Sequence, residues 1–469
     1  MPDLSAPPAM QLLQPGPTAV PLHLVALDAL TAWADMQLRR VRAWAEATGF
    51  LGSAGQVLLV PDADGGLAAV AVGLGTNRDR ARQPFVLGGA RSRLPRGCYR
   101  IEGAHDPDLL QEQVLGWLLA GYSYRRFRTT PAPVLADLIA PDGIDMARLN
   151  ALAAGDFLTR TLIDTPASHM GPEELEAAFV GLAEAQGADV SVIYGDDLLY
   201  HNLPLIHAVG RASERAPRLL DMRWGKAGPR LTLVGKGVCF DTGGLNLKPG
   251  ASMGLMKKDM GGAATVMGLA QVIMALNWPV QLRVLVPAVE NAVAGNAIRP
   301  GDILTSRKGL SVEINNTDAE GRLILADSLA LADEERPDAM ICMATLTGAA
   351  RVALGADVAP FFTRDAALSR VLLDSAAVQR DPLWPLPLHP AYEAAIEPGI
   401  ADLDNAPSGG MAGAITAALF LHRFVEQTPR FAHFDIYAHQ PKTEPGRAKG
   451  ALSQGARALV DALPKVLGL

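Results

Sequence analysis

Short apolar runs alternate with longer stretches of helical periodicity over most of the chain. In the second part of the sequence, six apolar runs have the length and composition of β-strands: Asp189–Tyr194, Arg218–Trp224, Leu231–Val234, Gln281–Val286, Ala339–Ala344 and Phe431–Ile436. Apolar residues at helical spacing predict four helices between or beside them: Pro172–Ala185, Gly262–Ala275, Gly321–Asp333 and Ala414–Val425. This alternation predicts an α/β domain with a central mixed sheet that is flanked by helices.

A turn sequence connects two of the predicted strands. Lys226-Ala227-Gly228-Pro229 lies between Arg218–Trp224 and Leu231–Val234. Glycine followed by proline is a strong turn signal, and short connections usually join antiparallel neighbours. The sequence therefore predicts a β-hairpin at this point.

The first part of the chain predicts a smaller α/β domain. Gln56–Val60 and Leu67–Val72 are typical of strands around the turn Pro61–Gly66, and Leu109–Ala120 has helical spacing. Six prolines within residues 1–21 predict an irregular arm, because proline fixes φ and lacks the N–H donor.

These patterns divide the chain into three parts. We expect the N-terminal α/β domain, with its proline-rich arm, at residues 1–150. A helical stretch over Asp145–Ile163 ends just before Pro166, so residues 151–164 are expected to form a linker helix. The larger α/β domain is expected at residues 165–469.

Composition favours a folded protein of a reducing compartment. Hydrophobic residues make up 49% of the 469 residues and charged residues 19%, which excludes a disordered chain. No run approaches the ~18 consecutive apolar residues of a membrane helix, and the first basic residue is Arg39, so we expect neither a membrane span nor a secretory signal. Three cysteines are too few for a disulfide framework. We therefore expect a cytoplasmic protein.

The charge distribution argues against a nucleic-acid partner. The formal net charge is −7, and residues 1–150 carry 14 Arg against 14 Asp and Glu. One stretch, Arg78–Arg100, holds seven arginines and a single acid, Asp79. We interpret it as a solvated surface, and a polyanion-binding patch is the alternative.

Lysine is concentrated at one place. The chain has nine lysines, and four of them fall between residues 236 and 258, in a glycine-rich segment that follows a predicted strand. Ends of strands in α/β sheets border binding crevices. A nucleotide site is not favoured, since no Walker loop occurs and the fingerprint begun by Gly235 and Gly237 has Phe240 at its third position.

Four carboxylates near this segment indicate a metal site: Asp241, Asp259, Asp318 and Glu320. Converging carboxylates cannot all stay ionised without cations. Two divalent metal ions about 3.5–4 Å apart, sharing carboxylates and a nucleophilic water, are the known solution. Lys236, Lys248 and Arg322 offer positive charge for an oxyanion. Oxygen ligands leave Zn, Mn and Mg open, and no HExxH or CxxC motif occurs.

At this point the sequence resembles the cytosolic leucyl aminopeptidase family. The resemblance is dense over about residues 155–440, and its most specific element is NTDAEGRL, which begins at Asn316. The other motifs that carry it are DTPASHMGPEEL (164–175), VGKGVCFDTGG (234–244), LNLKP (245–249), MKKDMGGAA (256–264), ENAVAGNAIRPGDI (290–303), TLTGAA (345–350) and GAITAALFL (413–421).

The resemblance implies a catalytic domain at 165–469 that removes N-terminal residues with two divalent metal ions, Zn or Mn and possibly Mg. Asp241 and Glu320 would bridge the metals. Lys236 and Asp259 would complete one metal site, and Asp318 would complete the other. Lys236 would have to bind as a neutral amine, so the metals would have to lower its pKa.

The resemblance also implies the remaining roles. Lys248 would polarise the scissile carbonyl, and Arg322 would hold a bicarbonate ion that accepts the proton of the water. The residues expected to line the pocket for the first side chain are Met256, Thr345, Leu346 and Gly348. Partners would be peptides with a free N-terminus and other subunits of a homohexamer. Two alternatives on the same fold are a catalytically silent protein and a nucleic-acid-binding regulator.

Two positions depart from the family pattern. Lys258 follows Met-Lys where the family usually has an aromatic or apolar residue, and Tyr437 replaces a small residue after Asp-Ile. The apolar character of the motif residues predicts a preference for a Leu- or Met-like first residue over Asp or Glu. Tyr437 could narrow this pocket towards smaller side chains.

Overall fold

The computed structural model describes residue 12 and residues 19–469. The described chain divides into two compact units, one of residues 158–440 and 450–469 and one of residues up to 157 together with 441–449. Most of the predicted proline-rich arm lies outside the described residues. Its last two residues, Val20 and Pro21, already belong to a strand.

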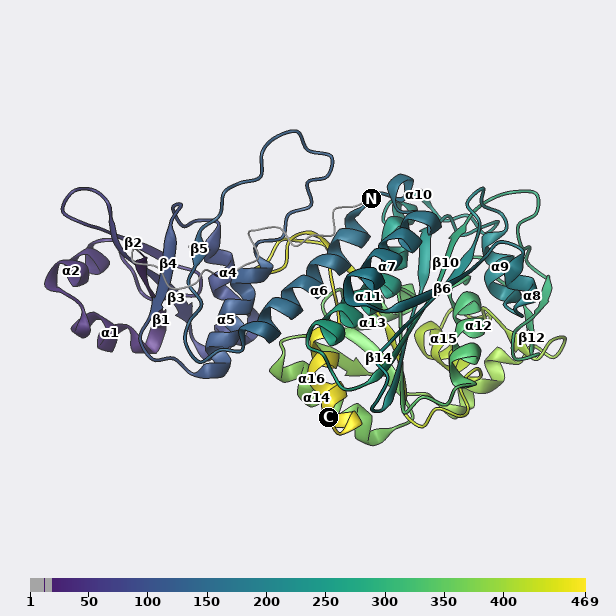
Figure 1. The fold of residues 1–469 in the computed structure, drawn as a ribbon. Helices are drawn as coiled ribbons and strands as arrows, with labels where there is room; N and C mark the ends of the chain where they lie inside the picture. The colour runs from purple at the N-terminus through teal and green to yellow at the C-terminus, as the bar shows by residue number, and fades with distance from the viewer. Residues whose placement is uncertain (1–11, 13–18) are drawn as a thin grey trace. The chain divides into compact units, whose positions relative to one another are not determined.

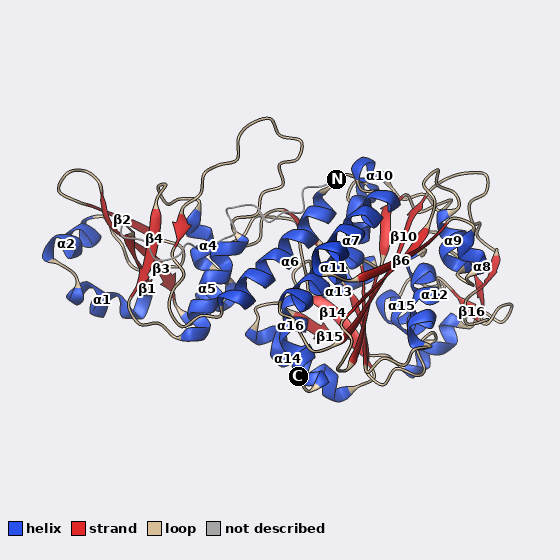
Figure 2. Ribbon diagram, in the orientation of Figure 1, coloured by secondary structure: helices blue, strands red, loops and turns tan. Residues whose placement is uncertain are grey.

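The larger unit is built on a mixed sheet (Figures 1 and 2). The order of its main strands is β15-β14-β17-β13-β8-β10-β7-β6, and β9 also pairs with β10. In chain order these strands are β6 (Asp189–Tyr194), β7 (Arg218–Trp224), β8 (Arg230–Gly235), β9 (Gly237–Asp241), β10 (Gln281–Asn291), β13 (Ala339–Ala344), β14 (Ala359–Thr363), β15 (Leu383–Pro385) and β17 (Phe431–Asp435). The central strands run parallel, whereas β6, β7 and β14 each pair antiparallel with a neighbour.

Helices cover both faces of this sheet (Figure 2). On one face α11 packs on β8 and β13 and contacts α7 and α16, and on the other α12 packs on β8 and β10 and contacts α9 and α15. The main helices are α7 (Pro172–Gln186), α9 (Pro204–Gly210), α11 (Gly261–Ala275), α12 (Gly321–Asp333), α13 (Gly348–Leu354), α14 (Ala366–Val378), α15 (Gly413–His422) and α16 (Ala456–Leu467). All residues of β13 are buried, as expected for a strand covered on both sides.

Short elements complete the larger unit. Its single-turn helices and 3-10 turns are η3 (Ala167–His169), α8 (Asp197–Tyr200), α10 (Gly250–Met253), η4 (Met256–Met260) and η5 (Pro390–Ile396). Two small sheets are formed by β11 (Ile303–Thr305), β12 (Ser311–Glu313) and β16 (Leu403–Asp404), and by β18 (His439–Gln440) with β19 (Gly450–Ala451).

The smaller unit contains a five-stranded sheet of order β2-β3-β1-β4-β5. Its strands are β1 (Val20–Ala26), β2 (Val57–Pro61), β3 (Leu67–Gly75), β4 (Cys98–Glu102) and β5 (Asp137–Leu138). Its helices are η2 (Leu27–Ala29), α1 (Leu30–Met36), α2 (Arg39–Ala47), α3 (Asn77–Arg82), α4 (Val86–Arg91) and α5 (Pro107–Leu119). The long helix α6 (Met146–Asp164) contains the residues at which the two units divide.

The arginine-rich stretch Arg78–Arg100 spans α3, α4 and part of β4. Arg91 is the member that the fold buries: its side chain donates to the backbone oxygens of Trp117 and Ala136 and lies over the Trp117 ring. This arginine therefore stabilises the smaller unit from inside. None of the helices in the described part of the chain is long and apolar enough to cross a membrane.

The structure confirms the predicted α/β fold, with a small N-terminal domain and a larger mixed-sheet domain. All six strands predicted for the larger domain are present, and β6, β7 and β13 have the predicted bounds. The four predicted helices are present too, and α12 begins and ends as predicted. The edge of the sheet formed by β14 and β15, together with α14 and α16, was missed.

The predicted hairpin is wrong. β7 and β8 are not paired, because β10 lies between them, antiparallel to β7 and parallel to β8. The turn instead closes over the entry into β10: a Cβ on Gly228 would lie 1.8 Å from the Pro279 oxygen. A turn signal depends only on neighbouring residues, so it could not reveal that β10, which begins at Gln281, lies between the two strands.

A second glycine sets the distance between α11 and the sheet. A Cβ on Gly262 would lie 2.1 Å from the Met343 oxygen and 2.9 Å from the Lys236 nitrogen. This close approach lets Ala263 N donate to Lys236 O (2.8 Å) while Lys236 N donates to Met343 O (3.0 Å). The start of α11 is thereby fixed at the ends of β8 and β13.

Replacement of Gly262 should therefore destabilise the fold. Gly262→Ala pushes a methyl group into backbone atoms, and overpacking of this kind costs about 1–3 kcal/mol. The matched control is Gly181→Ala in α7, where a Cβ meets no atom within 4 Å and alanine should gain about 0.5–1 kcal/mol. Denaturant unfolding of both variants would measure the difference, and equal stability of the two would contradict this account.

Candidate active site

The candidate site lies where the central strands end. At Lys236 the chain passes from β8, which pairs with β10 and β13, to β9, which pairs with β10 alone. The separation of β9 from β13 opens a crevice at the carboxyl ends of parallel strands, which is where α/β sheets hold ligands. Lys236 thus lies at the base of the crevice, and Asp241 follows at the end of β9.

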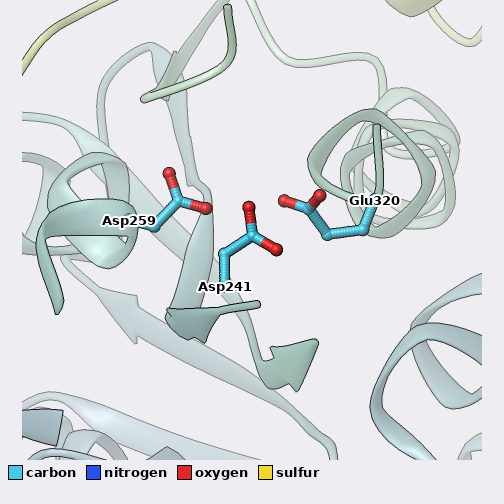
Figure 3. Close-up of side chains that lie close together, drawn as sticks. All are labelled: Asp241, Asp259 and Glu320. Carbon is cyan, nitrogen blue, oxygen red and sulfur yellow. The ribbon is translucent and has the colours of Figure 1, made fainter. Parts of the chain in front are cut away.

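Three buried carboxylates converge in this crevice. Asp241 ends β9, Asp259 lies in η4, and Glu320 immediately precedes α12. One oxygen from each lies within 4.8 Å of the others, and their residues are at most 3% exposed. Figure 3 shows Asp241 between the other two side chains, which reach it from opposite sides. The sequence had placed all three in one site.

Lys236 is enclosed by the same carboxylates. Its Nζ lies 2.7 Å from Asp259 Oδ2 and 2.9 Å from Glu320 Oε1, and it donates to the Thr345 oxygen at 3.0 Å. Burial alone would lower the pKa of Lys236, but the surrounding carboxylates outweigh burial and raise it. This ammonium therefore partly neutralises the acids.

Lys248 links the fourth acid to the group. Its Nζ lies 2.7 Å from Asp241 Oδ2 and 2.5 Å from Asp318 Oδ1. The Asp318 side chain is 32% exposed and lies outside the cluster of three. The neighbouring carboxylates raise the pKa of Lys248, although burial would lower it.

The two lysines leave the acids incompletely compensated. Glu320 Oε2 is buried and has no hydrogen-bond partner among the described residues. Burial, together with the neighbouring Asp241 carboxylate, raises the pKa of Glu320 to about 8. Four carboxyl groups thus face two ammonium groups, and one buried carboxylate oxygen remains available for a cation.

Further polar residues hold the acids in place: Asn291, which the sequence did not single out, and Thr345, which it placed only in the pocket wall. Asn291, at the end of β10, donates to Asp241 Oδ1 (2.9 Å) and to the Thr317 oxygen (3.0 Å). Thr345 donates its hydroxyl to Asp259 Oδ1 (2.8 Å). Asn291 lies within a quoted motif, so its position at a strand end was the available signal.

Asp435 fixes the loop after β13. Its Oδ1 accepts hydrogen bonds from the N–H groups of Leu346 and Thr347 at 3.0 Å, and its Oδ2 accepts from the Thr347 hydroxyl at 2.6 Å. The residue is buried at the end of β17, next to β13 in the sheet. It was missed because its partners are 88 and 89 positions away in the sequence.

Arg322 lies in the first turn of α12, beside Glu320. One of its terminal nitrogens donates to the Asn405 oxygen at 2.5 Å, whereas the buried Nε has no hydrogen-bond partner among the described residues. Burial lowers the pKa of Arg322 to about 10. The Arg322 side chain is thus a buried cation whose Nε–H remains available to donate a hydrogen bond.

Almost all of the predicted site residues line one cavity of about 550 Å³. It is lined by all four residues expected around the first side chain, and by every predicted metal or catalytic residue except Glu320. Lys258, Arg351 and Tyr437 also line it. Burial lowers the pKa of Lys258 to about 8. The four residues expected around the first side chain therefore form only part of the cavity wall.

Comparison with known proteins identifies this arrangement. A family model described as the catalytic domain of the cytosol aminopeptidase family matches residues 157–460, and one described as the M17 aminopeptidase N-terminal domain matches residues 20–141. The chain belongs to the cytosol aminopeptidase family. It is thus an aminopeptidase by class, a hydrolase, and the resemblance seen in the sequence is confirmed.

Individual relatives agree with this assignment. A probable cytosol aminopeptidase of Caulobacter vibrioides is 39% identical over 372 residues, which cover 76% of this chain and 75% of the relative. The crystal structure of the cytosol aminopeptidase from Coxiella burnetii superimposes with a TM-score of 0.91 at 40% identity, covering 97% of this chain and 98% of that one.

A structure with bound metal is also similar. The bottromycin maturation enzyme BotP in complex with Mn has a TM-score of 0.86 at 29% identity, covering 96% of this chain and all of that one. The family is metal-dependent, which agrees with the acidic cluster.

The loop after β13 offers a test of the geometry around the site. Asp435→Ala leaves the half-buried N–H groups of Leu346 and Thr347 without their acceptor, and an unsatisfied donor costs about 1 kcal/mol or more, up to about 3 kcal/mol where water cannot reach it. We expect a lower unfolding temperature and a loss of kcat/KM, because Thr345 and Leu346 line the cavity. Thr347→Val keeps both backbone contacts and removes two bonds of the hydroxyl, the one it donates to Asp435 and the helix cap it gives to Ala350 N (3.1 Å), so it should have the smaller effect on both. Equal effects would show that the backbone contacts do not matter.

Proposed function

We propose that this family member hydrolyses the N-terminal residue from peptides with a water that two divalent metal ions share. The observation that carries the proposal is the buried acidic cluster, with an unpartnered Glu320 oxygen, at the base of the cavity. Zn and Mn are both compatible with this donor set, and Mg is possible. The complex of the similar enzyme BotP with Mn supports a role for divalent metal in this chain.

The donor set fits a pair of cations. Asp241 and Glu320 would bridge them, Lys236 and Asp259 would complete one site, and Asp318 would complete the other. The chemistry supplied by the cations is Lewis acidity, which brings the pKa of water near neutrality. Lys236 would have to act as a neutral amine, and added positive charge close to its Nζ would lower its pKa in that direction.

Two cations of the chain remain for the reaction itself. Lys248 lines the cavity, and we assign its ammonium to the oxygen of the scissile carbonyl, where negative charge develops. Arg322 keeps a buried Nε donor without a partner among the described residues, which suits a bound anion such as bicarbonate. That anion would accept the proton of the attacking water.

The substrate's free amine would bind beside the metals, so only the first residue can be removed. Its side chain would enter the part of the cavity formed by the residues Met256, Thr345, Leu346 and Gly348. All seven proposed metal and catalytic residues are present, and six of them line one cavity. This completeness favours a working enzyme over a catalytically silent protein on the same fold.

Two substitutions separate metal binding from transition-state stabilisation. Glu320→Gln removes a bridging charge, so both metal content and turnover should fall. Lys248→Ala removes one preorganised donor, which typically costs about 10²–10³ in turnover, while the metal content should remain. Metal analysis and Leu-amide hydrolysis, after stripping and reloading with Zn, Mn or Mg, provide the readouts. Retention of both metals and full activity by Glu320→Gln would refute the assignment.

We also propose a homohexamer that acts in the cytoplasm. The names of the relatives, cytosol aminopeptidases, support this location. The low charge density of the chain, 19%, suits large buried interfaces. Light scattering at micromolar concentration should give six times the mass of the 49.4 kDa chain. A monomer under these conditions would overturn the proposed assembly.

A further inference from the structure

Two cations in the cavity wall have no part in the proposed reaction. Lys258 Nζ lies 5.1 Å from the centre of the Tyr437 ring, and Arg351 Cζ lies 5.0 Å from the same centre. All three residues line the cavity. Tyr437 therefore holds two positive side chains beside the motif residues of the pocket.

Neither cation has an acidic partner within the described chain, since no ion pair or hydrogen bond is formed by the side chain of Lys258 or of Arg351. Lys258 is only 8% exposed. Asp259 and Asp435 attract the ammonium through space but do not contact it. A buried cation without a contacting counter-charge is costly, and a cation–π contact offsets only part of that cost. The site thus lacks a carboxylate that would complete it.

The nearest acids are engaged elsewhere. Asp259 accepts from Thr345 through Oδ1 and faces Lys236 through Oδ2. Both oxygens of Asp435 accept hydrogen bonds from the loop after β13. Neither acid can turn to Lys258 without breaking contacts that shape the active site.

The local helix explains why Lys258 points to the cavity. Successive residues of a 3-10 turn are rotated by about 120°, so three consecutive side chains face three directions. Lys257 donates to the Asp164 oxygen at 2.5 Å, Lys258 lies over Tyr437, and Asp259 faces Lys236. Lys257 is satisfied by the protein, and Lys258 is not.

We propose that Lys258 and Arg351 form a carboxylate-binding subsite that selects an acidic first residue, Asp or Glu, in the substrate. This inference rests on the proposed aminopeptidase function. A guanidinium and an ammonium provide several donors for one carboxylate, and an acidic side chain would give both cations the partner they lack. The subsite reverses the preference for Leu or Met expected from the motif residues alone.

The matched substrates are the p-nitroanilides of Glu and Gln, which differ in charge but hardly in shape and carry no C-terminal carboxylate. We expect the metal-loaded enzyme to prefer Glu over Gln by at least tenfold in kcat/KM. Lys258→Met should reduce this ratio at least tenfold, and Lys258→Glu should invert it. Arg351→Gln should reduce the ratio less, because this arginine is exposed.

The control is Arg370→Gln in α14, which removes one positive charge at an exposed position outside the cavity. It should keep both the ratio and the activity. Cleavage of Gln and Leu anilides without any preference for Glu would overturn the subsite and leave the aminopeptidase function intact. A carboxylate effect seen only between Leu-Gly and its amide would assign the cations to the peptide C-terminus and would also overturn it. Failure of the loaded enzyme to cleave any anilide or peptide would refute the proposed function itself.

Discussion

The concentration of negative charge in a buried crevice is the constraint on which the rest of this structure depends. Asp241, Asp259 and Glu320 repel one another at close range, and water cannot screen them where they lie. No local sequence preference would hold them together. Each is therefore fixed on a different element, Asp241 at the end of β9, Asp259 in η4 and Glu320 before α12, so that the packed sheet and its helices resist their separation. Lys236 lowers the repulsion without removing it.

The architecture provides this resistance through close backbone contacts. The pairing of β8 with β13 ends just before Lys236, and the start of α11 lies against that point because Gly262 has no side chain. Asn291 and Asp435 then tie neighbouring strand ends to the loops that carry the acids and the pocket wall. The favourable free energy of the packed core thus offsets the repulsion among the buried carboxylates and holds them in a fixed arrangement.

Periodicity was sufficient for the elements that the sheet buries on both sides, such as β13, since a short, continuous apolar run is typical of a strand covered on both faces. It failed where the pairing is non-local, as between β7 and β8, because an inserted strand leaves no mark in the turn. The acids and lysines of the site were predictable from their motifs. Asp435 was not, because a single aspartate at a strand end is common and its meaning lies in partners far along the chain.

The proposed specificity subsite and the proposed metal site use adjacent residues that face different ways. In η4, Asp259 belongs to the acidic cluster, whereas the Lys258 side chain lies over the Tyr437 ring and lines the cavity. A change at position 258 therefore alters the charge that a substrate meets without removing a hydrogen bond or ion pair of Asp259. The departures at positions 258 and 437 also depend on each other: the ring gives the buried ammonium a favourable neighbour, and the ammonium gives the ring a fixed position. Such a pair can change the selected side chain while the geometry of the reacting atoms is preserved.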